Sequence, residues 1–268
     1  MAIALPSRRW TAKPPRHRFD INWSSPLADG LVFFPWLGEG VPVDLANGIA
    51  GDDSGPAARV ATKEGDALYI DGADILFANV PHGIEQGAFS IAASWRWDGT
   101  TQNWQSIISI NDDATFYLPR NQSQNYGSMD TRAGNARNWT TMAVNSGEIA
   151  SYGYSIEGTT TTPIGYKDGI SVGNASGTSI WNTFGTTSDV EVGKGQGTEY
   201  CHGALPYVAL WNRVLTARDY EALHRNVWGE LARSSKRYFF IPSTGAGPAP
   251  TGSANDEYYK TLLSGTGF

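Results

Sequence analysis

The stretch from Cys201 to Leu223 reads CHGALPYVALWNRVLTARDYEAL. Its first half, up to Trp211, is rich in the aromatic and branched residues that strands favour. Thr216 suits the N-cap of a helix, and Asp219 three residues later completes a short-chain version of a capping box. The apolar residues that follow at helical spacing are Tyr220, Leu223 and Val227. The stretch therefore predicts a strand followed directly by a short helix near 216–225.

Short β-like runs precede this stretch, separated by Gly, Asn, Asp and Pro. From Phe89 to Trp95 apolar residues alternate with Ser90 and Ser94, as expected for a strand with two different faces. Asp-Gly pairs such as Asp71-Gly72 and Asp98-Gly99 supply the positive φ that tight hairpins need. The clearest runs are 31–34, 67–70, 89–95, 106–110, 140–144, 152–156, 189–192, 207–211 and 237–241. Long helices do not alternate with these runs, so the pattern predicts an all-β, antiparallel two-sheet sandwich.

Residues 26–241 resemble the laminin-G-like, concanavalin A-like lectin/glucanase superfamily, in the version common among bacteriophage and prophage structural proteins. Asn212, Arg213 and Leu215 match the "N-R-x-L" turn that follows the closing strand of that family. Asn226-Val-Trp228 resembles its "N-P-W", with Val227 in place of Pro. The resemblance implies a jelly-roll sandwich. We expect Asn212 and Arg213 to tie the last strand to the helix start, the guanidinium donating to local carbonyls or a carboxylate.

The chain divides into a basic, Pro-rich N-terminal arm (1–26), the sandwich (27–241) and a Gly/Ser/Pro-rich tail (242–268). Residues 1–26 hold five basic residues and one acidic residue, Asp20, which gives this segment a net charge of +4. The whole chain has a net charge of −6, so the remaining residues carry −10. The arms also hold large rings, which need a surface to pack on: Trp10, Phe19, Trp23, Tyr258, Tyr259 and Phe268. We expect them to dock on another subunit or on a shell, giving a homo-oligomer, with a trimer favoured, that contacts other virion proteins such as the major capsid protein. The alternative is that the arms fold back on their own sandwich or stay disordered.

The acidic body disfavours nucleic acid as a partner, since it would repel phosphate. Cys201 is the only cysteine, which rules out an intrachain disulfide and fits synthesis in a reducing cytoplasm. The start of the chain is too short and too quickly charged for a signal-peptide core, and no apolar run reaches the ~18 residues of a membrane span.

Catalytic residues are not evident. The glucanase branch carries Glu-x-Asp-x-x-Glu on one strand, so that two carboxylates act on one glycosidic bond. Asp189-Val-Glu191 is the nearest fragment, and it reads better as the solvated face of a strand. We expect no enzyme activity, with glycan hydrolysis kept as an alternative.

Four tryptophans lie in or beside Asn-, Gln- and Ser-rich stretches: Trp97, Trp104, Trp139 and Trp181. A ring flanked by amides suits a sugar, which stacks on the ring and bonds to the amides. The alternative is that these rings cap the sandwich core. Asp112 and Asp168 lie in turn-like stretches and are candidate calcium ligands, with turn formation as the alternative. Calcium is the one cofactor kept open, because the four histidines lack paired zinc spacing.

The sequence thus supports a bacteriophage virion structural protein made in the host cytoplasm and displayed on the particle surface, as a capsid decoration or head-fibre subunit with weak glycan binding. A tail-associated adhesin that binds bacterial surface glycans is the first alternative, and a glycan hydrolase the second. Fold alone does not choose between them.

Overall fold

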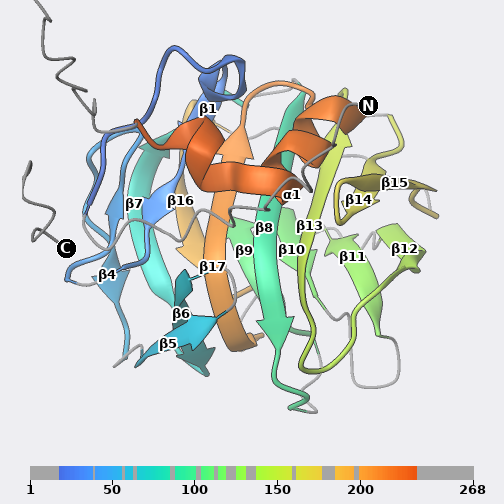
Figure 1. The fold of residues 1–268 in the computed structure, drawn as a ribbon, viewed down its shortest axis with the longest axis horizontal. Coiled ribbons are helices and arrows are strands. Elements are labelled where there is room, and N and C mark those ends of the chain that lie inside the picture. The colour runs from blue at the N-terminus through green and yellow to red at the C-terminus, as the bar shows by residue number, and fades with distance from the viewer. Residues whose placement is uncertain are drawn as a thin grey trace, which may run out of the picture. The chain divides into compact units, whose positions relative to one another are not determined.

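The computed structural model describes residues 18–233, apart from residue 39 and residues 56–57, 63–64, 85–87, 101–103, 112–113, 119–124, 131–136, 159–160, 177–184 and 196–198. These residues form two antiparallel sheets, with helix α1 (Ala217–Leu231) lying across one of them (Figure 1). The predicted all-β sandwich with one C-terminal helix is confirmed. None of the helices in this part of the chain is long and apolar enough to span a membrane.

Strand order defines two sheets. Sheet 1 runs β15 (Ile170–Asn174), β14 (Ile164–Lys167), β13 (Ile149–Ile156), β8 (Phe89–Trp97), β17 (His202–Trp211), β6 (Gly65–Asp71), β5 (Ala58–Thr62), and β1 (Leu31–Phe33) also pairs with β17. Sheet 2 runs β12 (Arg137–Ala143), β11 (Tyr126–Asp130), β10 (Ala114–Tyr117), β9 (Ser106–Ile110), β16 (Thr187–Val192), β7 (Ile75–Pro81), β4 (Asp52–Asp53). The short strands β2 (Pro35–Trp36) and β3 (Val43–Asp44) form a separate pair, and a 3-10 turn, η1, spans Pro26–Ala28.

The core lies between the sheets and follows the alternation in the sequence. Along β8 the alternate apolar side chains join the central cluster: Phe89, Ile91, Ala93, Trp95 and Trp97. Ser90 lies on the opposite face, where its hydroxyl contacts Ser155 and the backbone of the turn after β17. Each predicted strand between residues 31 and 211 coincides with a strand of the structure. Predicted strand 237–241 lies outside the described residues.

Helix α1 covers the outer face of sheet 1. Thr216 caps it and Asp219 closes the capping box, as the sequence predicts. The buried residues Tyr220, Leu223 and Val227 pack with sheet residues into a second apolar cluster. The helix extends beyond the predicted residue 225 to Leu231, because Trp228 and Leu231 continue the apolar face. A kink occurs at Asn226, whose φ of −167° and ψ of 71° are not helical.

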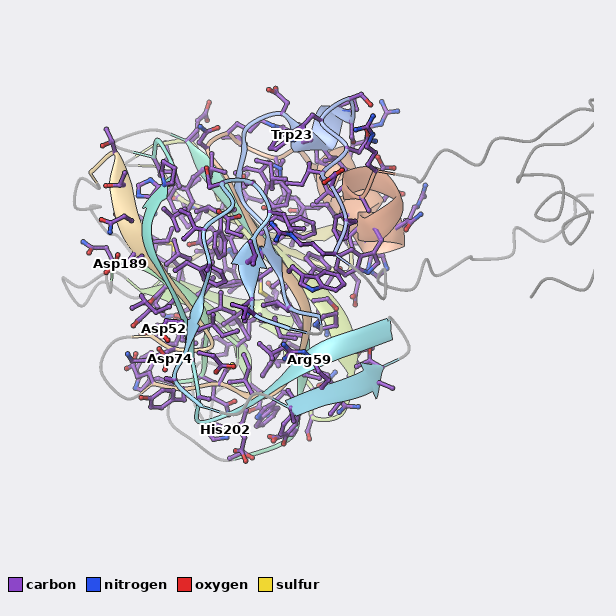
Figure 2. All side chains as sticks on the ribbon, turned by 90° about the vertical axis from the view of Figure 1, so that its left-hand side faces the viewer. Trp23, Asp52, Arg59, Asp74, Asp189 and His202 are labelled. Atoms are coloured by element: carbon purple, nitrogen blue, oxygen red, sulfur yellow. The ribbon has the colours of Figure 1, made fainter. Side chains whose placement is uncertain are left out.

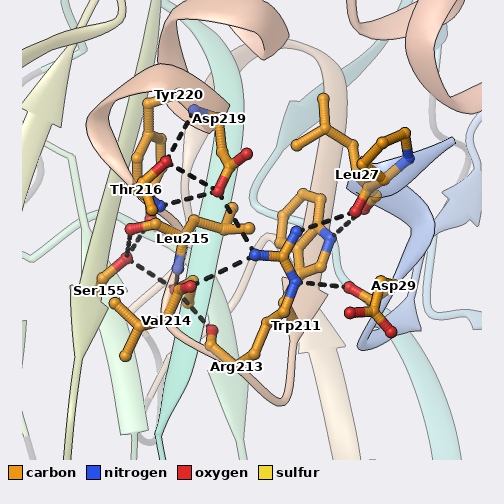
Figure 3. Close-up of polar contacts among 12 residues, drawn as sticks. Leu27, Asp29, Ser155, Trp211, Arg213, Val214, Leu215, Thr216, Asp219 and Tyr220 are labelled. Carbon is orange, nitrogen blue, oxygen red and sulfur yellow. Dashed lines mark hydrogen bonds and ion pairs between the residues drawn. The ribbon is translucent and has the colours of Figure 1, made fainter.

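Arg213 joins β17, α1 and the N-terminal segment (Figure 3). Its Nε donates to the carbonyl of Asp29 at 2.7 Å, and Nη2 donates to the carbonyl of Pro26 at 3.1 Å. Its Nη1 lies 3.3 Å from the carbonyl oxygen of Val214 and 3.4 Å from Oδ2 of Asp219. Beside it the backbone N–H of Asn212 donates to the carbonyl of Gly30 at 2.8 Å. The two residues therefore tie the closing strand to the helix start and to η1.

The N-terminal segment differs from the prediction. Residues from Phe19 on were expected in an arm, but Ile21 is buried and forms a β-bridge with Ala232. The ring of Phe19 packs edge-on against Trp228, with 5.7 Å between centroids, and against two further aromatic rings. Phe19 is therefore part of the sandwich and not of an assembly arm, because its own chain offers an aromatic pocket for it. Trp23 is 59% exposed. The other predicted arm rings, Trp10, Tyr258, Tyr259 and Phe268, lie outside the described residues.

Candidate functional site

The two sheets present different outer faces. Helix α1 buries the central part of the outer face of sheet 1, whereas the outer face of sheet 2 carries polar groups. One row of register partners crosses five strands of sheet 2: Asp52, Leu76, Glu191, Ser109 and Thr115. Both neighbours of Glu191 on β16 lie in the core, so strand alternation turns this row outward.

Burial varies along the row. Ser109 and Thr115 are fully buried, Leu76 and Glu191 are half-buried, and Asp52 is exposed. Among the described residues the hydroxyl of Thr115 has no hydrogen-bond partner, which is costly for a buried group. Figure 2 shows Asp52, Asp74 and Asp189 along the side of the molecule away from α1. We call the accessible groups of this sheet the polar face: Asp52, Leu76, Asp189, Glu191 and Lys194.

Lys194 organises the charges of the polar face. Its Nζ lies 3.0 Å from Oε1 of Glu191 and 3.8 Å from Oδ2 of Asp74. Burial alone would lower the pKa of Lys194, but the hydrogen bond and the charges of these carboxylates raise it above its usual value. The other oxygen of Glu191 accepts a long hydrogen bond, 3.5 Å, from the hydroxyl of Ser109. Lys194 is thus held as a cation between two carboxylates.

A tryptophan lies at one end of the polar face, just before β9. The ring of Trp104 is half-buried and meets the ring of Tyr117 at 5.3 Å and an interplanar angle of 64°. The hydroxyl of Tyr117 donates to Oε2 of Glu199. Trp104 has a φ of 57°, a left-handed conformation that is unfavourable for a bulky residue and recurs at functional sites.

Gln105 holds Trp104 in this conformation. It is fully buried, and its amide donates to the carbonyl of Thr100 at 2.7 Å and accepts from the backbone N–H of His202 at 3.0 Å. Its own carbonyl accepts from the N–H of Leu118 at 2.8 Å. Gln105 is one of the amide residues beside Trp104 in the sequence, and both ends of its amide bond within the protein and not to a sugar. Its role is to fix the loop that presents Trp104.

Polar groups of sheet 1 lie at the same end of the sandwich as Trp104. The hydroxyl of Tyr69 donates to Asp98 at 2.8 Å, and this hydrogen bond raises the pKa of Tyr69 to about 12. Burial alone would raise the pKa of Asp98, but hydrogen bonds from Thr100 and Tyr69 lower it, so this carboxylate is ionised at neutral pH. His202 Nδ1 lies 2.8 Å from Oδ1 of Asp71. Asp71 and Asp98 form what we call the border, which adds two carboxylates to the end of the sandwich that holds Trp104.

The predicted tryptophans do not form one site. Trp139 is 1% exposed and stacks on Tyr154 in the core, 5.4 Å between centroids. Trp97 is 6% exposed, also in the core, and its Nε1 donates to Thr100. The prediction that these two rings contact a glycan is wrong, because both rings are buried between the sheets. Trp104 reaches the surface, and Trp181 lies outside the described residues.

Asp168 is a turn residue. With a φ of 51° it forms the hairpin between β14 and β15 together with Gly169, whose φ is 77°. One carboxylate oxygen accepts from the N–H of Ser151 at 3.0 Å and lies 3.6 Å from Nδ1 of His224. Within the described ranges no three His, Cys, Asp or Glu side chains gather as metal ligands. Asp112, the other calcium candidate, lies outside those ranges.

Sequence reasoning missed Tyr117, Lys194 and Glu199. Tyr117 lies on a short strand, and the other two follow β16 in a Gly-rich loop. The outward position of Glu191 was available from the alternation in 189–192. The charge partner of Glu191, Lys194, could not be predicted from the sequence, because only the fold fixes the path of the loop after β16.

No protein-family model matches the chain, and no curated protein sequence matches it. Solved structures do. Domain 4 of an extracellular arabinanase from Geobacillus stearothermophilus, in complex with arabinotriose, aligns with a TM-score of 0.55 and 13% identity, over 68% of this chain and 91% of that domain.

Two further solved structures are much longer than the region that aligns with this chain. The binding domain of botulinum neurotoxin DC, in complex with SialylT, aligns with a TM-score of 0.54 and 10% identity, over 74% of this chain and 52% of that one. Trypanosoma rangeli sialidase aligns with a TM-score of 0.53 and 15% identity, over 73% of this chain and 33% of the enzyme. The chain thus spans about half of the toxin domain and a third of the sialidase. At these identities the likeness concerns the fold, which is a β-sandwich of the lectin-like type.

Proposed function

We propose that this protein is a non-catalytic, glycan-binding surface module, and that the polar face with Trp104 at its end is the binding surface. The observation that carries the proposal is the loop that holds Trp104. A bulky ring in a left-handed conformation is presented at the surface and is fixed by a fully buried glutamine. Strain of this kind is kept where the surrounding structure serves a site.

The chemistry around Trp104 suits a sugar. A partly exposed indole offers an apolar face for a sugar ring. Glu199 and Glu191 supply carboxylate acceptors for hydroxyl groups, and Lys194 supplies a donor. Sheet 2 has this surface, whereas α1 occupies the corresponding face of sheet 1. Domains of this fold are solved with arabinotriose and with a sialyl ligand, which adds support.

Binding without hydrolysis is the form that we propose. Glu191 is engaged by Lys194 and Ser109, and Glu199 by Tyr117, so each carboxylate has a structural partner. The location that we propose is the surface of a bacteriophage particle, on a decoration subunit, a head fibre or a tail-associated adhesin. That location rests on the resemblance of residues 26–241 to the version of the superfamily common among phage structural proteins.

The test is a glycan array followed by calorimetric titration with the best short oligosaccharide. Trp104→Ala should weaken binding about tenfold or more, as expected for a central aromatic contact. Trp23→Ala is the matched control, because Trp23 is also an exposed tryptophan, at 59%, and lies on the N-terminal segment. Trp23→Ala should keep the affinity of the wild type for the short oligosaccharide, because Trp23 lies away from the carboxylates of the polar face (Figure 2).

Equal affinity of Trp104→Ala and the wild type would remove the polar face as the binding surface. The bound oligosaccharide is then incubated with the protein and assayed for new reducing ends. Release that disappears in Glu191→Gln or Glu199→Gln would make the protein a hydrolase instead.

A further inference from the structure

The charges of the polar face carry an inference about its ligand, and this inference rests on the proposed function. Along the described part of the face and its Trp104 end, carboxylates outnumber cations. The carboxylates are Asp52, Asp74, Asp189, Glu191 and Glu199, with Asp71 and Asp98 on the border, where Arg96 is a neighbouring cation. The cation of the described polar face, Lys194, is already engaged by two carboxylates at 3.0 and 3.8 Å.

The acidic carboxylates lie close to one another. Asp52 and Glu191 share a register row two strands apart, about 10 Å at the usual strand spacing. Asp189 and Glu191 are two residues apart on β16, about 7 Å along the strand. At about 0.1 M salt the Debye length is about 10 Å, which is no shorter than either separation, so a ligand here meets the combined field of these carboxylates.

The whole chain supports the same sign. Outside residues 1–26 the net charge is −10, and this figure includes every lysine and arginine of the body. A sialic acid, phosphate or sulfate group would approach this surface against repulsion. A neutral sugar meets no such penalty and gains the carboxylates as hydrogen-bond acceptors.

We propose that the polar face selects neutral glycans, built of hexoses and N-acetylhexosamines, and discriminates against anionic ones. This differs from what the structural neighbours suggest, since one of them is solved with a sialyl ligand. The ligand class that we infer is therefore set by the charges on this chain and not by the fold.

The experiment uses the full chain on an array that carries each neutral oligosaccharide beside the same oligosaccharide bearing sialic acid or phosphate. At about 10 mM salt, where the Debye length is about 30 Å, the anionic member of a bound pair should bind about tenfold more weakly. At about 1 M salt, where the Debye length is about 3 Å, the difference should nearly vanish.

Two double variants separate local from global charge. Asp52→Asn with Asp189→Asn neutralises the polar face, and Asn keeps the oxygen with which Asp189 accepts from the N–H of Asn79. This variant should reduce the low-salt discrimination to about threefold. Glu221→Gln with Glu230→Gln makes the same change in net charge on α1, which covers the other sheet, and should leave the discrimination unchanged.

Three outcomes are informative. Absence of binding to any member of the array overturns the proposed function itself. Binding of the anionic members at equal or higher affinity overturns the neutral-ligand inference and leaves glycan binding standing. Equal effects of the two double variants would show that net charge and not the polar face governs selectivity, which also overturns the inference.

Discussion

Gln105 and Asp44 are fully buried polar residues, and each holds backbone segments together. Oδ1 of Asp44 accepts from the N–H groups of Phe34 and Ala46, both at 3.0 Å. Burial raises the pKa of Asp44, although these hydrogen bonds act in the opposite direction. The turn at residues 44–48 thus depends on the carboxylate of Asp44 and on Gly48, whose φ is 74°.

The environment of single tryptophans was the least predictable feature of the sequence. Trp139 lies between Asn138 and Thr140 on β12, and neighbours along a strand point to opposite faces. Their polarity therefore says nothing about the surroundings of the ring, which packs in the core. Trp104 precedes its strand, where alternation does not apply, so only the fold reveals its exposure.

His82 makes the stability of the fold depend on pH. It is fully buried, its Nδ1 accepts from the N–H of Ile84 at 3.1 Å, and burial lowers its pKa below the usual 6.5. A group with a lowered folded pKa stabilises the fold above its unfolded pKa and loses that contribution as the pH falls. The wild type should therefore lose stability below about pH 6.5 relative to His82→Asn, which keeps an acceptor near Ile84 but does not titrate.

Urea denaturation of both proteins between pH 4 and pH 8 measures this difference. The difference in unfolding free energy should be constant above about pH 7 and shift in favour of the variant below it. A difference that stays flat across the whole range would mean that His82 does not titrate on unfolding.

Secondary-structure elements were predictable where alternation is long. Strand β8 was predicted near its observed limits because apolar residues repeat in it with period two. Strand β9 was predicted at its observed limits because it is a short run rich in isoleucine. Strand β4 consists of two aspartates, which carry no strand signal, and it exists because it pairs with β7. Helix α1 was underestimated because its apolar face continues through Trp228 and Leu231 beyond the kink at Asn226.

Arg213 should be a major contributor to the stability of the joint between β17 and α1. Arg213→Ala removes donors to the carbonyls of Asp29 and Pro26 and the contact with Asp219, so unfolding should cost about 2–3 kcal/mol less. Arg213→Lys should recover little of this, because an ammonium cannot match the planar fork of the guanidinium.

The control for this prediction is Arg225→Ala. Arg225 forms an exposed pair with Glu221 on α1, and such pairs contribute about 0.5 kcal/mol or less. Chemical denaturation should thus separate the two alanine variants clearly. Equal stability of Arg213→Ala and Arg225→Ala would contradict a structural role for the N-R-x-L turn.

The whole molecule is asymmetric. One sheet is covered by α1 and by the segment around Ile21, and the other presents charged groups. The sequence predicted the sandwich, since many short strands and turn signals agree. It did not predict where the N-terminal arm ends. Pro and Arg dominate residues 1–18, but Phe19, which follows them, has its ring partners only once the fold brings Trp228 and Phe34 together.

The two terminal arms are expected to hold several copies of the chain together. Residues 1–17 carry basic residues and Trp10, the tail carries Tyr258, Tyr259 and Phe268, and the described structure leaves Trp23 59% exposed. Apolar rings left in water cost roughly 25 cal/mol per Å², so we expect the arms to dock on a second copy of an acidic body. The full chain should form a homo-oligomer, most simply a trimer, by light scattering. Deleting residues 1–17, which spares Phe19 and Ile21, or separately residues 245–268, should reduce the measured mass toward that of one chain. If both truncated proteins keep the mass of the full-length assembly, the arms are not what holds it together.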